Sequence, residues 1–123
     1  MTMALGDLIG VPLKDGGWGV LQVSAFRASA SGSRIRSTFS AGVLPWRGEG
    51  APTRDAIAGL QFLEHGLTPI KIFTEGRLEV VDTAPLAGGL QSNLNDYSIG
   101  TTHSVWGWKT AIRRAQQASL ARS

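Results

Sequence analysis

The chain has 123 residues, of which 42% are hydrophobic and 17% are charged, which suits one domain with a buried core and is too short for two. It contains no cysteine, which excludes disulfide scaffolds, thiolate zinc sites and cysteine nucleophiles. The net charge is +3, and residues 108–123 carry basic side chains without any acidic one. We therefore expect a single domain over residues 1–123 that lacks the uniformly basic surface of a general polyanion binder.

The first third of the chain is predicted to form an antiparallel sheet. Alternating apolar residues predict strands over 8–13 and 18–26, and the Lys-Asp-Gly-Gly sequence at 14–17 predicts the tight turn between them, because glycine readily adopts positive φ angles. Both faces of 18–26 are apolar, which is typical of a central, covered strand. Alternation over 34–39 predicts a third strand.

The centre of the chain is predicted to contain one helix and a second hairpin. Thr53 is a candidate N-cap, apolar residues follow at helical spacing, and His65-Gly66 is a candidate stop, so we expect a helix over 53–65. Strands are expected over 68–74 and 77–82, joined by a turn at Glu75-Gly76.

Residues 83–102 lack a regular pattern, and a loop of that length is usually functional or contains a short strand, here around 97–99. The tail, from Trp106 or Trp108 to Ala121, is rich in alanine, glutamine and arginine, which predicts a helix. Trp108 shares a face with Ile112, so we expect it to anchor this helix, while the role of Trp106 stays open.

Few residues in this sequence are suited to catalysis or metal binding. His65 and His103 are the only histidines, and neither has a second ligand at metal-binding spacing, so no metal or other cofactor is expected. Ser104, His103 and Asp96 contain the groups of a hydrolytic triad, but no nucleophile-elbow motif presents the serine. We therefore expect a binding protein rather than an enzyme.

Two binding surfaces are compatible with the sequence. Between Gly16 and Gly48 there is no acidic residue, and arginines alternate with aromatic residues, a combination that holds single-stranded nucleic acid by phosphate pairing and stacking. The candidates for that role are Arg27, Arg34, Arg36, Trp18 and Trp46. Alternatively, the tryptophans fill a core and the arginines solvate its rim. Trp106-Gly107-Trp108, entering a basic helix, is a second candidate contact for a partner.

The amino-terminal residues add a family resemblance. The run Gly6-Asp7-Leu8-Ile9-Gly10-Val11-Pro12-Leu13-Lys14-Asp15-Gly16, followed by Gly19-Val20-Leu21-Gln22-Val23, resembles the start of bacterial immunity-protein family 26. The resemblance covers about the first 25 residues. It implies a small SH3-like barrel and an antitoxin of a polymorphic toxin system, which binds and neutralises a toxin domain. Because this chain is basic, the implied toxin presents an acidic surface or is not a nuclease.

Together these observations predict a mainly β, α+β fold. We expect five or six strands in a partly open barrel or bent antiparallel sheet, with one covering helix and one carboxyl-terminal helix. The leading interpretation is a cytoplasmic immunity protein that contacts its toxin without crossing a membrane, and the alternative is a small basic nucleic-acid-binding barrel. The predicted partner-binding residues are Arg34, Arg36, Trp46, Arg47, Asn95, Tyr97, His103 and Trp106.

Overall fold

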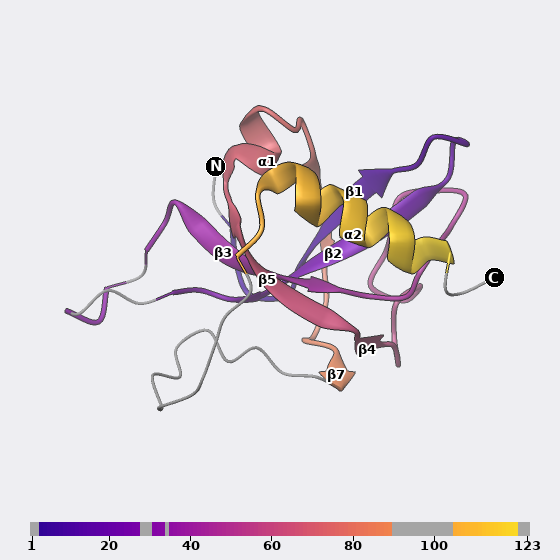
Figure 1. Ribbon diagram of the computed structural model, residues 1–123. Coiled ribbons are helices and arrows are strands. Elements are labelled where there is room, and N and C mark those ends of the chain that lie inside the picture. The colour runs from indigo at the N-terminus through magenta and orange to yellow at the C-terminus, as the bar shows by residue number, and fades with distance from the viewer. Residues whose placement is uncertain (1–2, 28–30, 34, 90–104, 121–123) are drawn as a thin grey trace.

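The computed structural model describes residues 3–27, 31–33, 35–89 and 105–120 (Figure 1). Its main element is an open five-stranded antiparallel sheet in the order β5-β3-β2-β1-β6. The strands are β1 (Asp7–Pro12), β2 (Trp18–Ala25), β3 (Thr38–Val43), β5 (Glu64–Pro69) and β6 (Glu79–Thr83). A short parallel pair, β4 (Gln61–Phe62) and β7 (Gly88–Gly89), and two helices, α1 (Lys71–Thr74) and α2 (Trp108–Leu120), complete the fold. The predicted mainly β, α+β class is confirmed, in the form of a sheet that does not close into a barrel.

The first hairpin and the terminal helix form where the sequence predicts them. β1 pairs with β2 from Leu8↔Gln22 to Pro12↔Trp18. In the turn between them, Gly16 has a φ of +91°, and the Leu13 N–H donates to the Gly17 carbonyl at 2.9 Å. α2 lies across one face of the sheet, with α1 beside its first turn (Figure 1). Within the described residues, neither helix is long and apolar enough to span a membrane.

The helix predicted over 53–65 is wrong. Residues 54–59 form consecutive turns, and the chain then enters β4 and β5. Gly59 has a φ of +82°, which ends any right-handed helix at that point. His65 and Gly66 lie inside β5 and pair with Gly42 and Ala41 of β3, so sheet pairing replaces the predicted helix stop.

The second predicted hairpin is also wrong. β5 ends at Pro69 and α1 follows, so in the segment predicted as the strand 68–74 only Thr68 and Pro69 belong to a strand, and residues 71–74 form a helical turn. The helical turn buries the adjacent Ile72 and Phe73 in the same core, which a strand cannot do because neighbouring side chains alternate between faces. β6 then pairs with β1, a strand far away in the sequence.

Apolar clusters cover both faces of the sheet. Alternate residues of β1, β2 and β3 form one cluster with α1 and α2, and it includes Ile9, Leu21, Val23, Phe39 and Ala115. The opposite cluster contains Leu8, Val20, Leu44, Trp46, Ile57, Phe62 and Ala84. The expectation of a central strand with two covered faces is therefore confirmed for β2.

Each of the four tryptophans packs against a glycine. A Cβ added at Gly10 would lie 3.0 Å from the Trp18 ring, and one at Gly76 would lie 3.0 Å from the Trp108 ring. At Gly48 and Gly66 an added Cβ would overlap the rings of Trp46 and Trp106. The absence of a side chain at these glycines is therefore what lets the indole rings lie flat on the backbone.

Candidate functional site

The structure describes half of the predicted contact residues. Arg34, Asn95, Tyr97 and His103 lie outside the described residues, as do Asp96 and Ser104. Of the others, Arg36 is exposed and Arg47 is half-buried. Trp46 and Trp106 each keep only 6% of their surface exposed, so neither offers its ring to a partner in this structure.

Arg36 and Arg47 do not form one patch. Arg36 precedes β3 and Arg47 follows it, and a six-residue strand lies between them. At a rise of about 3.3 Å per residue, the strand spans about 17 Å. The two arginines therefore lie at opposite ends of β3 and have different neighbours.

The two buried tryptophans have structural roles. Trp46 belongs to the cluster on the face opposite α2 and packs on Gly48. The Trp106 ring lies on Gly66, while its backbone N–H donates to the Leu67 carbonyl at 2.8 Å. Trp108 is half-buried and packs against the α2-side cluster, which confirms its predicted anchoring role. The Trp-Gly-Trp sequence thus fixes the start of α2 to the sheet.

Arg47 lines a cleft between the β1–β2 turn and the last turns of α2. Its guanidinium forms two contacts with the Asp15 carboxylate, Nη1 to Oδ1 at 3.1 Å and Nη2 to Oδ2 at 2.9 Å. The hydrogen bond from the Gly17 N–H, followed by that from Arg47, lowers the pKa of Asp15 below its ordinary value of 3.8. The cleft has a volume of about 230 Å³, and its lining is Leu13, Lys14, Asp15, Arg47, Gln116, Ser119 and Leu120.

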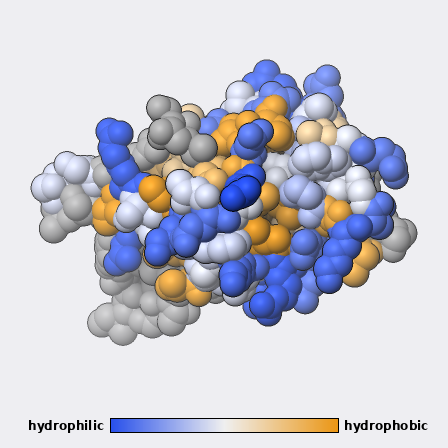
Figure 2. Space-filling view, turned by 90° about the horizontal axis from the view of Figure 1, so that it is seen from above, coloured by the Kyte–Doolittle hydropathy of each residue, from blue (hydrophilic) through white to orange (hydrophobic). Residues whose placement is uncertain are grey.

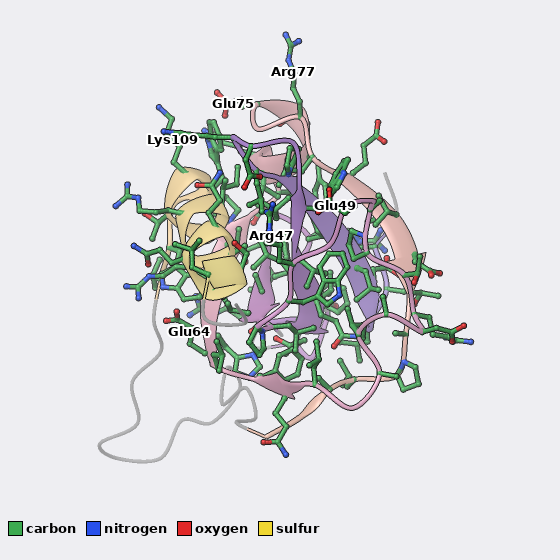
Figure 3. The ribbon with its side chains drawn as sticks, turned by 90° about the vertical axis from the view of Figure 1, so that its right-hand side faces the viewer. Arg47, Glu49, Glu64, Glu75, Arg77 and Lys109 are labelled. Atoms are coloured by element: carbon green, nitrogen blue, oxygen red, sulfur yellow. The ribbon has the colours of Figure 1, made fainter. Side chains whose placement is uncertain are left out.

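A stripe of side chains on α2 continues from this cleft. Lys109, Arg113, Gln116 and Leu120 recur at the i, i+4, i+7 and i+11 positions, so they share one flank of the helix. We call these four residues the α2 stripe. Gln116 reaches the Pro12 carbonyl with its Nε2 at 3.5 Å, which shows that this flank faces β1. Figure 3 shows Arg47 beside the end of α2, with Lys109 at the other end of the helix.

The opposite flank of α2 is paired with the sheet. Arg114 contacts Glu64 at 3.3 Å and lies 5.8 Å from the centre of the Trp106 ring. This cation therefore helps to hold the helix on β5, whereas no ion pair occupies Lys109 or Arg113 in the part of the chain that the structure describes. Among the described residues, the cation on this flank is therefore paired with an acid of the sheet, and the two cations of the α2 stripe are not paired with an acid.

His65 joins a polar network between strands. Its Nδ1 lies 2.9 Å from the Ser24 hydroxyl, which shares a 2.8 Å hydrogen bond with the Ser40 hydroxyl. Both serines are buried, and they link β2 and β3 to β5. The predicted position of His65 at a helix end is wrong, and the sequence gives no sign of its serine partners because they are far apart along the chain.

A larger cleft lies on the other face of the molecule. Its volume is about 480 Å³, and it separates the turns at 54–61 from the segment 84–88. The buried Gln22 side chain fixes one wall, because its Nε2 donates to the Ala84 and Pro85 carbonyls and its Oε1 accepts from the Ala87 N–H at 3.1 Å. Arg54, Asp55 and the half-exposed Leu86 stand among the lining residues. The lining therefore contains both a positive and a negative side chain, so it does not favour a ligand of one particular charge.

Groups suited to metal binding do not converge in this structure. Among the described residues, no three histidine, aspartate or glutamate side chains lie close enough together to hold a metal ion.

Comparison with protein-family models, curated proteins and solved structures finds no match to this chain. Its function must therefore be argued from the surface itself.

The α2 stripe, as a candidate binding surface, has a signal in the order of the residues along the sequence. The spacing of positions 109, 113, 116 and 120 is that of one helix flank, so the stripe is visible in the sequence once the helix is accepted. Its neighbours Leu13, Lys14 and Arg47 come from distant segments, and only the folded chain shows that they lie beside it.

Proposed function

We propose that this chain is an immunity protein that binds a bacterial toxin domain and neutralises it by direct contact. The observation that carries the proposal is the basic surface of α2. Lys109 and Arg113 are exposed on a helix that contains no acidic residue, whereas the exposed Arg114 pairs with Glu64 of β5. A surface of one sign favours a partner of the opposite sign, which here means an acidic toxin surface.

Lys109 lies 5.5 Å from the centre of the Trp108 ring, and its position on the helix is unfavourable for a cation in other respects. It lies in the first turn of α2, where the positive end of the helix dipole repels a cation, and no acid in that turn compensates. Stability alone would favour the opposite arrangement, with acids at the start of the helix. The resemblance of the first 25 residues to bacterial immunity-protein family 26 also supports a role in binding, and it is the reason for proposing a toxin as the partner.

Protein binding is better supported than nucleic-acid binding. Every aromatic ring in the described part of the chain is buried or half-buried, so no open stacking platform is available there. Single-stranded nucleic acid is usually held by such rings together with cations. In the view of Figure 2, hydrophilic residues also divide the hydrophobic ones into small patches, which suits a contact led by charge.

The test is co-expression with the protein encoded by the reading frame directly upstream, which the proposal predicts to carry the toxin domain. We expect the toxin alone to stop growth, the pair to grow, and the two proteins to co-purify as a complex that survives dilution to micromolar concentration. Growth arrest in the presence of the chain, with no complex at that concentration, would overturn the proposal. Binding of an oligothymidylate that weakens steeply with salt would instead support the nucleic-acid alternative.

A further inference from the structure

We propose that the cleft between α2 and the β1–β2 turn binds an acidic segment of the partner that carries one apolar side chain. This inference rests on the proposed function and names the surface that performs it. The surface consists of the α2 stripe together with Leu13, Lys14 and Arg47 across the cleft.

The apolar part of the cleft defines where the partner's side chain would lie. Leu120 is 70% exposed at the end of α2, and Leu13 stands opposite it on the β1–β2 turn. When a partner covers a largely exposed leucine, apolar surface is removed from water, and this contributes favourably to the free energy of binding. The cleft volume of about 230 Å³ is large enough for one large side chain, and both leucines belong to its lining.

The charges around the cleft define the rest of the segment. Lys14 lines the cleft, and Arg113 lies three residues before the lining residue Gln116 on α2. Both cations are exposed, and neither forms an ion pair within the residues that the structure describes. Asp15 is the acid at the cleft, and Arg47 already neutralises it through two contacts. Glu75, which Figure 3 shows near Lys109, lies 3.9 Å from Lys71. Carboxylates on either side of an apolar residue would therefore meet cations that have no other anion.

Phosphate backbones fit this surface less well. A nucleic acid would supply the negative charge, but it offers no aliphatic side chain for the space between Leu13 and Leu120. The chemistry of the cleft, apolar in the middle and cationic at the rim, is that of a peptide with acidic residues flanking a leucine.

The experiment is an NMR titration of the isotope-labelled full chain with the capped peptide Glu-Asp-Leu-Asp-Glu. We expect shifts concentrated on Leu13, Lys14, Arg113, Gln116 and Leu120 at up to millimolar peptide. A peptide with serine in place of leucine should bind several-fold more weakly, and one with lysines in place of the acids should not bind. Absence of shifts at millimolar peptide, or tighter binding of oligothymidylate at the same residues, would overturn the inference.

Two charge-reversed variants separate this inference from the proposed function. Lys14→Glu with Arg113→Glu reverses one cation that lines the cleft and one on the neighbouring α2 stripe, and Arg54→Glu with Arg77→Glu makes the same change in net charge at exposed positions that do not line this cleft. We expect the first pair to weaken both the peptide and the toxin complex about tenfold, and the second pair to change neither. If the toxin complex forms and only the second pair weakens it, the cleft is excluded while the proposed function stands. If no toxin complex forms at all, the proposed function itself fails.

Discussion

The contact between Gly66 and Trp106 gives a sharp prediction of stability. We expect Gly66→Ala to lower the free energy of unfolding by about 3 kcal/mol, because the new Cβ would overlap the carbons of the Trp106 ring. Overpacking that neighbours can absorb costs about 1–3 kcal/mol, and complete loss of a buried aromatic contact costs about 3–5 kcal/mol. We expect a cost of about 3 kcal/mol, at the top of the first range and the bottom of the second. The Trp106 backbone N–H is hydrogen-bonded to the Leu67 carbonyl, which limits how far the ring can move away from the new Cβ.

A double-mutant cycle isolates this contact. In the Trp106→Ala background the space above Gly66 is empty, so Gly66→Ala should cost nothing or stabilise the strand by about 0.5 kcal/mol. Urea unfolding followed by far-ultraviolet circular dichroism measures all four proteins, since tryptophan fluorescence would change with the ring itself. Gly50→Ala is the control, because nothing lies within 4 Å of a Cβ there.

Additive losses in this cycle would refute the argument. If Gly66→Ala cost as much without Trp106 as with it, the penalty would arise from the strand and not from the ring. A destabilisation of about 3 kcal/mol corresponds to a fall in Tm of about 10–15 °C for a chain of this size, which thermal unfolding would also detect.

Three further predictions address other parts of the fold. Arg77 has a φ of +59° in the turn after α1, so Arg77→Gly should raise the free energy of unfolding by about 0.5–1 kcal/mol in urea, and an unchanged value would reveal a compensating contact of the arginine. Gln22→Leu should cost about 3 kcal/mol and speed hydrogen exchange at Ala87, because buried backbone groups of 84–87 lose their partner, and protection equal to wild type would contradict this. The pKa of Asp82 is lowered below 3.8 by hydrogen bonds from the Arg54 and Thr83 N–H groups, so the stability it provides is present above that pH and is lost as the pH falls through its folded value. Between about pH 5 and pH 2 the urea midpoint should therefore fall less steeply for Asp82→Asn than for wild type, and parallel curves would exclude the effect.

The elements that the sequence predicts well are those whose signals are local. The turn at 14–17 and the α2 helix depend on residues a few positions apart, and both form as expected. The helix predicted over 53–65 had suitable spacing, but residues 54–59 form turns, and pairing with β3 together with the close fit of Gly66 under Trp106 favours a strand from Glu64 onward. Such long-range competition is invisible in a window of ten residues.

The candidate site shows the same division. The cations of α2 were visible in the sequence, and so was the exposed position of Arg36. A core role was one of two interpretations of Trp46, and the role of Trp106 was open. Both rings are buried, because Gly48 and Gly66 provide backbone without side chains beneath them. A high glycine content suggests turns, yet in this fold some of the glycines leave the space that the indole rings occupy.

The small residues under α2 determine how closely the helix approaches the sheet. Its buried positions are Ala111, Ala115, Ala118 and Ser119, and a Cβ added at Gly19 of β2 would lie 3.2 Å from the Ala115 carbonyl oxygen. The backbone of the helix therefore packs directly on the backbone of β2, with no large side chain between them. A larger residue at position 19 or 115 would push α2 away from the sheet and would move the exposed side chains of the helix with it.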